Sequence, residues 1–362
     1  MVEACAAASI PCEVLPFPRA LHAFGSDHRR ASARSILRTV RRLLPWARAG
    51  LACLHYKQAL RRRLMQLRPD VIHSNGAKMH LLGALAKPRS ALLVWHLHDY
   101  LEKRSALRAL LRSVVSRCSM MIAVSMSIAT DARKALPQGP SAAVIHNAVD
   151  TDVFSPHGPA LNLAALSGLP TPPSGALRVG LVATFAHWKG HEIFLQAAAF
   201  APENHRFYII GGPIYATGGS QWSIEELRAR AAALGLADRV GFTGFVEDVP
   251  AAMRGLDVVV HASTEPEPFG LVILQAMACA RPVIVTATGG ARELIDPGEN
   301  ALAVPAGDSR ELARAIERLA ADPALRLRLA EAGRANAERR FSLSRLSVEA
   351  LRFYEDLRAQ CH

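Results

Sequence analysis

The sequence predicts an α/β fold built from two doubly wound domains. The chain has 362 residues, which is enough for two domains at about 100–200 residues each. Short runs of Val, Ile and Leu without polar alternation are typical of strands that are covered on both faces. Helical stretches lie between these runs, and such alternation predicts parallel sheets. Hydrophobic residues make up 50% of the chain and charged residues 20%, which excludes wholesale disorder.

The first half of the chain contains five predicted strands and opens with a short helix, Val2–Ala8. The strands are Glu13–Phe17, Val71–His73, Leu92–His96, Met121–Val124 and Ala143–His146. Two longer helices are predicted at Ala106–Arg117 and Ser125–Ala135. A doubly wound domain normally opens with a strand, a Gly-rich loop and a helix. We therefore expect that the first βαβ elements are missing, for which a misassigned start codon is the simplest explanation.

The second half predicts a sheet with its helices in regular alternation. Its strands are Arg178–Val182, Arg206–Ile210, Val240–Thr243, Asp257–His261, Pro282–Val285 and Ala301–Val304. Its helices are Gly190–Ala199, Ser223–Leu234, Leu271–Ala280, Ser309–Ala320 and Pro323–Arg340. A segment rich in Pro and Gly precedes this half and marks a linker. We predict domains at 1–155 and 177–340, a linker at 156–176, and a C-terminal helix within 341–362 that packs back toward the first domain.

Charge and cysteine content exclude several classes of protein. The formal net charge is +12, of which residues 1–150 contribute +15 and residues 151–362 contribute −3. One half is therefore expected to meet something anionic. None of the six cysteines forms a C-x-x-C pair, which favours reduced packing thiols and excludes a structural zinc site. No apolar stretch is long enough for a transmembrane helix, and no signal peptide is evident.

The segment Asp257–Ala280 carries the strongest chemical pattern. A buried strand runs into a loop, and the loop runs into an apolar helix. Ligands of open α/β sheets bind beyond the carboxyl ends of the strands. Glu267 can accept hydrogen bonds from sugar hydroxyls, and the helix start can face an anion such as a diphosphate. The N–H groups concerned belong to Phe269, Gly270 and Leu271. Gln275 lies about 8 Å further along the helix. An ordinary strand–loop–helix with solvated glutamates explains the same pattern equally well.

Several motifs in order resemble glycosyltransferase family 4, the retaining GT-B enzymes. The run EPFGLVILQAMA is similar to the family signature, in which two Glu residues stand eight positions apart. Glu267 takes the first place, and Gln275 departs from the family at the second. Further similar segments are VIHNAVDTDVFSP, WKG, GFTGFVEDV, TGGARELI and PAGD. The resemblance runs from about Val71 to the C-terminus.

This resemblance implies two Rossmann-like domains facing across a cleft. The first would bind the acceptor, and the second a nucleotide-sugar donor. Glu267 is then expected near the donor sugar. Gln275 is expected at the ribose hydroxyls, with weaker hydrogen bonds than a charged Glu would make. No metal is expected, because no metal-ligating cluster is visible in the sequence and similar enzymes of this fold are usually independent of metals. The nucleoside diphosphate sugar is a co-substrate, and no cofactor is expected.

The resemblance also selects residues after the first strand of the second domain. Lys189 is expected to neutralise the donor diphosphate as the sugar–phosphate bond breaks. Family members often carry Arg where this sequence has Thr184, and His187 is expected to supply part of that contact. Gly212 permits close approach near the nucleotide, and Val246 resembles the loop that flanks the base. A solvated lysine and a simple tight turn are the alternatives for Lys189 and Gly212.

In the first half, a strand ends in LLVWHLHDY. The resemblance places His98 beneath the donor sugar and near the acceptor, with His96 as the second choice on the same side of the strand. Asn75 follows the strand Val71–His73 and is expected on the acceptor side. Catalysis is thus assigned to His98, Lys189 and Glu267. A histidine at the end of a strand is otherwise more often structural.

The segment His28–Arg68 is strongly basic, and Leu60, Leu64 and Leu67 share one helical face. Such a helix can lie on an anionic membrane, although a solvated arginine-rich face explains it too. Nucleic-acid binding has no supporting motif. The resemblance implies a retaining hexosyltransferase of glycolipid, polysaccharide or cell-envelope glycan synthesis. With the basic segment, it leads us to expect a cytoplasmic protein that is peripheral at the inner face of the membrane. Rival predictions are another GT-B chemistry, such as an epimerase or phosphorylase, and a degenerate or truncated domain that binds without catalysis.

Overall fold

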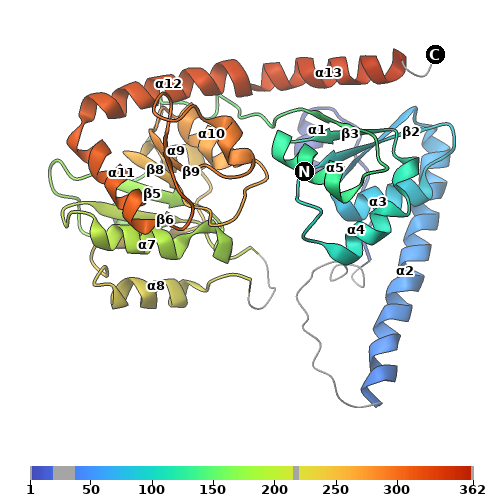
Figure 1. Ribbon diagram of the computed structural model, residues 1–362, viewed down its shortest axis with the longest axis horizontal. Helices are drawn as coiled ribbons and strands as arrows, with labels where there is room; N and C mark the ends of the chain where they lie inside the picture. The colour runs from blue at the N-terminus through green and yellow to red at the C-terminus, as the bar shows by residue number, and fades with distance from the viewer. Residues whose placement is uncertain (1, 19–36, 215–219, 360–362) are drawn as a thin grey trace. The chain divides into compact units, whose positions relative to one another are not determined.

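The computed structural model describes residues 2–18, 37–214 and 220–359, and it confirms the predicted α/β class. The chain divides into two compact units. Unit 1 comprises Met1–Ala123 and Ala129–Ala143, and unit 2 comprises Val124–Ile128 and Val144–His362. Each unit is built around its own sheet of parallel strands (Figure 1).

Unit 1 holds a four-stranded sheet in the order β1-β2-β3-β4, and its strands follow the predicted runs closely. The strands are β1 (Val71–Asn75), β2 (Leu92–Leu97), β3 (Met120–Ala123) and β4 (Ala142–Val144). The helices are α1 (Val2–Ala7), α2 (Leu37–Leu67), α3 (Ala77–Ala86), α4 (Ser105–Arg112), the 3₁₀ turn η2 (Val115–Arg117) and α5 (Met126–Ala135). The predicted helix Ala106–Arg117 is therefore broken into α4 and η2. Residues 28–36 of the predicted basic segment lie outside the described residues.

The predicted strand Glu13–Phe17 is wrong. This segment has no strand partner and lies as irregular chain against α2. Pro16 within the run has no N–H to donate to a ladder, which opposes strand pairing. The Phe17 ring instead contacts Tyr56 edge-on at 5.2 Å, and Arg63 pairs with Glu13 at 2.6 Å. The segment is thus anchored by the Phe17 ring and the Glu13 carboxylate, while Val14 is 64% exposed.

Unit 2 holds a six-stranded parallel sheet in the order β10-β9-β8-β5-β6-β7. All six strands were predicted. They are β5 (Arg178–Val182), β6 (Arg206–Ile210), β7 (Val240–Gly244), β8 (Val258–His261), β9 (Val283–Thr286) and β10 (Leu302–Val304). The central strands are apolar and buried on both faces, as parallel strands covered by helices should be.

Two layers of helices cover this sheet (Figure 1). One contains α7 (His191–Phe200), α8 (Ile224–Ala233) and α11 (Ser309–Ala321), and the other contains α9 (Val249–Arg254), α10 (Leu271–Ala278) and α12 (Pro323–Phe341). The remaining elements are α6 (Leu163–Ser167), which lies within the predicted linker, the 3₁₀ turns η3 (His187–Lys189) and η4 (Gly290–Leu294), and the C-terminal α13 (Leu343–Ala359).

The strand order creates a switch point between β5 and β8. The chain passes from β5 to β6 and β7 on one side, and then returns to place β8 on the other side of β5. The loops that follow β5 and β8 therefore leave the same edge of the sheet in opposite directions. Open α/β sheets bind their ligands at this position. The two loops that carry Lys189 and Glu267 are the ones that meet there.

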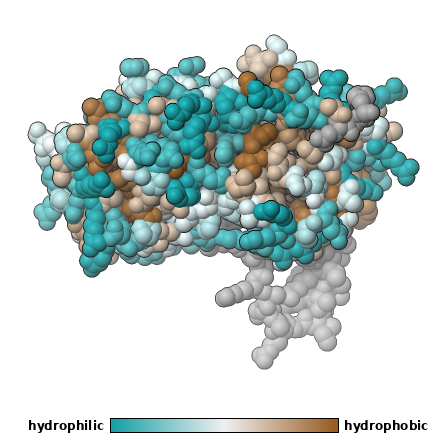
Figure 2. Space-filling view, turned by 45° about the horizontal axis from the view of Figure 1, so that its top comes forward, coloured by the Kyte–Doolittle hydropathy of each residue, from teal (hydrophilic) through white to brown (hydrophobic). Residues whose placement is uncertain are grey.

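Hydrophobic side chains on the face shown in Figure 2 form small separate groups among hydrophilic ones. Along the part of the chain that the structure describes, no helix combines the length and the apolar character needed to span a bilayer.

Candidate active site

The loops after β5 and β8 are joined to each other by their backbones. Thr264 donates its N–H to the carbonyl of Trp188 at 2.8 Å. Gly190 has a φ of +76°, and a Cβ at this position would lie 1.8 Å from the carbonyl oxygen of Ala262. Only glycine fits both the conformation and the space. The close approach brings Lys189, which precedes Gly190, over the loop that contains Glu267.

Lys189 and Glu267 form a bidentate ion pair at the switch point. The ammonium nitrogen lies 2.8 Å from Oε1 and 2.9 Å from Oε2 of Glu267. The two side chains are mostly buried, with 18% of Lys189 and 10% of Glu267 exposed. The ammonium also lies 4.1 Å from the ring centroid of Trp188, within the range of a cation–π contact. A fixed positive charge therefore faces the point where the two loops meet.

Glu267 rests on a layer of buried polar side chains from β8 and β9. Ser263 Oγ donates to Oε2 at 2.9 Å, and His261 Nε2 lies 3.3 Å from the same oxygen. Thr286 in turn contacts the other ring nitrogen of His261 at 3.3 Å. Burial by itself raises the pKa of Glu267, but the hydrogen bond with His261 and the charge of Lys189 outweigh it and lower that pKa to about 2. The carboxylate is therefore ionised at neutral pH.

The chain after Glu267 is held by η4. Gly290 donates its N–H to the carbonyl of Glu267 at 2.7 Å. A Cβ on Gly290 would lie 2.1 Å from the carbonyl oxygen of Pro268, so the two backbones touch. Gly270 has a φ of +97° and begins α10. The first turn of a helix leaves N–H groups without intrahelical partners, and these form an anion-binding end.

The other predicted donor-binding residues lie at the carboxyl ends of β5, β6 and β7 or on α10. Thr184 is the second residue after β5 and is half-buried. The His187 ring contacts the Trp222 ring in a tilted arrangement, with 4.2 Å between the ring centroids. Gly212 follows β6 and is covered by the ring of Phe245, which itself is 63% exposed. The remaining members of this set are Val246 after β7, the exposed Leu271, the half-buried Gln275, and Phe269, whose buried ring leaves only its backbone for a ligand.

In unit 1 the structure brings together the three residues predicted there. His98 Nε2 lies 3.0 Å from Oδ1 of Asn75, and the rings of His96 and His98 are 4.2 Å apart. His73, which was not predicted, contacts His96 at 3.1 Å. Burial, followed by the charge of His98, lowers the pKa of His96 to about 3. Burial also lowers the pKa of His98, against the opposing charge of Asp99.

Sequence reasoning missed the residues that support Glu267. His261, Ser263 and Thr286 are polar side chains at the ends of apolar strands, and this placement was the available signal. Gly290 lies in the recognised run TGGARELI, to which no role was assigned. Among residues 2–18, 37–214 and 220–359, no group of three or more His, Cys, Asp or Glu side chains is placed to hold a metal ion.

Comparison with known families matches both halves of the chain. Residues 2–153 match the profile described as Glycosyltransferase Family 4, and residues 176–322 match the one described as Glycosyl transferases group 1. Together these matches account for most of the chain and include the loops that carry Lys189 and Glu267.

Individual relatives agree with the family profiles. The chain is 33% identical over 204 residues to the lipopolysaccharide core mannosyltransferase LpcC of Rhizobium leguminosarum. The aligned region covers 56% of each protein. It is 38% identical over 133 residues to the phosphatidyl-myo-inositol mannosyltransferase of Mycobacterium leprae, covering 36% of this chain and 35% of the relative. The chain thus spans about half or less of these curated relatives. The structure resembles Anabaena HepE in complex with UDP, with a TM-score of 0.72 and 29% sequence identity. The match covers 84% of this chain and 82% of HepE.

Proposed function

Because this chain belongs to glycosyltransferase family 4 and has its two-domain GT-B fold, we propose that it transfers a sugar from a nucleoside diphosphate sugar to an acceptor hydroxyl. The ion pair of Lys189 and Glu267 at the β5–β8 switch point is the observation that carries the proposal. The complexes of HepE with UDP and with UDP-glucose support a nucleotide-sugar donor. The names of LpcC and the Mycobacterium leprae relative support an acceptor in glycolipid or lipopolysaccharide synthesis.

In the proposed mechanism the main task of unit 2 is to stabilise the departing diphosphate. The ammonium of Lys189 neutralises charge that develops on the leaving phosphate, and the N-terminus of α10 supplies N–H donors. Glu267, already ionised, accepts hydrogen bonds from sugar hydroxyls. Lys189 therefore divides its hydrogen bonds between Glu267 and phosphate when donor binds. We propose a front-face displacement with retention of configuration, in which the departing phosphate takes the acceptor proton and no metal takes part.

His98 is the residue proposed to face the reacting sugar from unit 1. Its lowered pKa leaves a neutral imidazole at neutral pH, and its Nε2 is directed at Asn75 Oδ1. With Asn75 as acceptor, Nε2 carries the proton and Nδ1 keeps its lone pair. A neutral ring of this kind can accept a hydrogen bond from a sugar or acceptor hydroxyl.

An anionic membrane surface is the proposed location of a lipid-linked acceptor. Of the predicted apolar face of α2, Leu60 and Leu64 are half-buried and only Leu67 is exposed. Leu51, Leu54 and Met65 are also each more than half exposed. Arg61 and Arg62 are exposed beside them. Mixed apolar and basic side chains on one helix suit a peripheral helix on acidic lipids, at the cytoplasmic face of the membrane.

Thermal unfolding against a panel of UDP-, GDP- and ADP-sugars tests the proposal. A ligand that binds only the folded protein stabilises it by about 2.7 kcal/mol at a hundredfold excess over Kd. We expect one nucleotide to raise Tm clearly, Lys189→Ala to abolish the shift, and Lys134→Ala, which removes an exposed lysine, to leave it intact. A cooperatively folded protein that no nucleotide stabilises would favour the degenerate, non-catalytic alternative instead.

A further inference from the structure

A buried serine from the first half of the chain holds the loop that carries Glu267. Ser125 follows β3, yet Val124–Ile128 groups with unit 2. The Ser125 side chain is fully buried, and its Oγ donates to the carbonyl oxygen of Pro268 at 2.7 Å. The same Oγ accepts the N–H of Ile128 at 3.1 Å, as a helix N-cap does. One hydroxyl thus both begins α5 and binds the residue next to Glu267.

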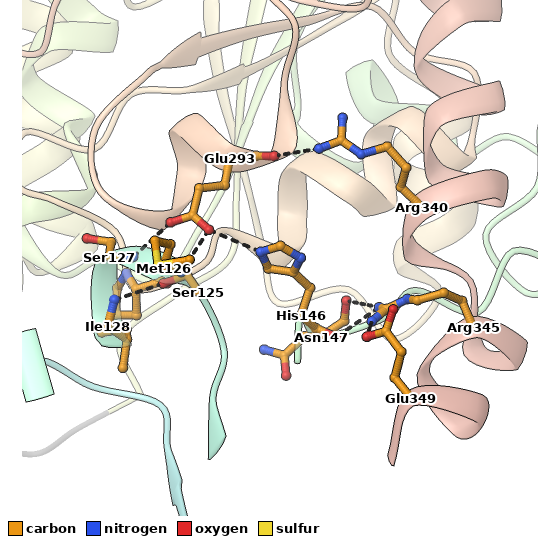
Figure 3. Close-up of polar contacts among 11 residues, drawn as sticks. Ser125, Met126, Ser127, Ile128, His146, Asn147, Glu293, Arg340, Arg345 and Glu349 are labelled. Carbon is orange, nitrogen blue, oxygen red and sulfur yellow. Dashed lines mark hydrogen bonds and ion pairs between the residues drawn. The ribbon is translucent and has the colours of Figure 1, made fainter. Parts of the chain in front are cut away.

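Glu293 in turn holds the segment that contains Ser125. Figure 3 shows its carboxylate directed at the first turn of α5, where it accepts the N–H groups of Met126 at 2.8 Å and Ser127 at 2.9 Å. His146 Nε2 lies 3.0 Å from the same carboxylate. Burial raises the pKa of Glu293, but the hydrogen bonds with His146 and with these two backbone N–H groups lower it overall. An ionised carboxylate at a helix N-terminus is favourable for the helix dipole.

Glu293 belongs to the 3₁₀ turn that also contacts the Glu267 loop directly. It lies on η4 three residues after Gly290, whose N–H binds the carbonyl of Glu267. The contacts therefore form a closed ring. It runs from the Glu267 loop through Gly290 to Glu293, from there to the start of α5, and through Ser125 back to Pro268. The loop is held at two consecutive carbonyl groups, those of Glu267 and Pro268.

From this ring we infer that Glu293 and Ser125 are positioning residues for Glu267 and for the N-terminus of α10. The inference rests on the proposed function, because it concerns the donor site of that function. Neither side chain contacts Lys189 or the carboxylate of Glu267 in the interactions described. They act on the backbone between Glu267 and α10, where a displacement of about 1 Å is enough to cost roughly a hundredfold in rate.

The test compares binding of UDP and of UDP-glucose by calorimetry, with GDP and GDP-mannose run in parallel. The variants are Ser125→Ala, Ser125→Thr and Glu293→Gln. Threonine keeps the hydroxyl and should rescue what alanine loses. We expect Ser125→Ala and Glu293→Gln to weaken binding of the nucleotide sugar by about tenfold or more. We expect a smaller loss for the free nucleotide, because Glu267 is proposed to bind the sugar. Matched controls are Ser347→Ala on α13 and Glu299→Gln in an exposed loop of unit 2.

Hydrogen exchange supplies a readout that needs no ligand. In Ser125→Ala, the backbone N–H groups of residues 264–270, apart from Pro266 and Pro268, should exchange faster, while those of β5 stay unchanged. A variant that only melts earlier, with unchanged nucleotide-sugar affinity and unchanged exchange in this loop, would show a purely structural role and overturn the inference. If the wild-type protein binds none of the nucleotides, the proposed function itself fails, and the inference falls with it. Loss of affinity in the alanine but not the threonine variant supports it.

Discussion

Glu267 shows at the scale of a single residue how the site keeps a buried charge. Burial alone favours the neutral acid, and the carboxylate remains ionised only because neighbouring groups outweigh that cost. Lys189 supplies the opposite charge, while Ser263 and His261 supply hydrogen bonds. Removing one partner leaves the others in place but makes the burial of the charge more costly. The residue is therefore a sensitive reporter of its surroundings.

The lowered pKa of Glu267 predicts a specific loss of stability in acid. Its pKa falls from the usual 4.5 to about 2 on folding, so between these values the unfolded chain binds more protons than the folded one. Stability from this group is therefore complete above pH 4.5 and is lost as the pH falls toward 2. Its upper limit is on the order of 3 kcal/mol. Urea unfolding of the wild type and Glu267→Gln should show a free-energy difference that shrinks over this range. A difference independent of pH would contradict the prediction.

The histidine beneath Glu267 predicts a stability effect of its own. His261→Leu removes the contact with Glu267 and leaves Thr286 without its side-chain partner, so we expect a loss of about 1–3 kcal/mol in the free energy of unfolding. Urea denaturation at pH 7 measures it. His157→Leu, which alters an exposed histidine, is the control and should change stability by about 0.5 kcal/mol or less. Equal effects of the two changes would argue against a supporting role for His261.

At the scale of elements, three short segments define the site together. They are η3 after β5, the chain between β8 and α10, and η4 after β9. Each is too short to be stable alone, and the backbone contacts that join the three leave no room for a Cβ at Gly190 or at Gly290. Gly190 allows η3 to touch Ala262, and Gly290 allows η4 to touch Pro268. These contacts place Lys189 and Glu267 within hydrogen-bonding distance.

Gly290→Ala should therefore disturb the site more than the fold. The new Cβ would lie 2.1 Å from a backbone carbonyl, so η4 or the Glu267 loop must move. We expect a loss of about 1–3 kcal/mol in stability and a clear loss of nucleotide-sugar affinity. Gly50→Ala, on an exposed part of α2 with nothing within 4 Å of the added Cβ, should instead stabilise by about 0.5–1 kcal/mol. Thermal unfolding and calorimetry on both variants check the contrast, which fails if their effects agree in sign.

At the scale of the whole molecule, positive charge is concentrated in the first half of the chain. Residues 1–150 have a net charge of +15, and residues 151–362 have a net charge of −3, which together give +12. A charge separation of this size directs binding of anionic surfaces to one part of the molecule. It also predicts that such binding weakens as salt screens the charges.

Vesicle binding tests this prediction. Vesicles with acidic lipids should bind the protein, those with neutral lipids should not, and the binding should fall as the salt concentration rises. Each basic residue near an acidic surface contributes about 1 kcal/mol, so Arg61→Glu with Arg62→Glu should weaken binding by at least about tenfold. The control is Arg328→Glu with Arg352→Glu, which reverses two exposed charges of unit 2. Equal losses in both double variants would show that α2 has no special part in the binding.

The sequence alone determined most of the secondary structure, because the signals that form strands and helices are local. All six strands of unit 2 and the start of α10 could be placed from apolar runs and helical periodicity. The family resemblance then selected Lys189 and Glu267. The strand predicted at Glu13–Phe17 was wrong, because a short apolar run has the same composition whether it pairs in a sheet or lies against a helix.

Only the tertiary structure decided what surrounds Glu267. Its side-chain partners come from the loops after β5 and β8 and from the end of β8, and Lys189 stands 78 residues away along the chain. Ser125 and Pro268 are separated by 143 residues. The sequence shows which side chains are available for such contacts. It does not show which of them meet, because a polar contact across this distance depends on strand order and on backbone approach at single glycines, and neither leaves a periodic pattern along the chain.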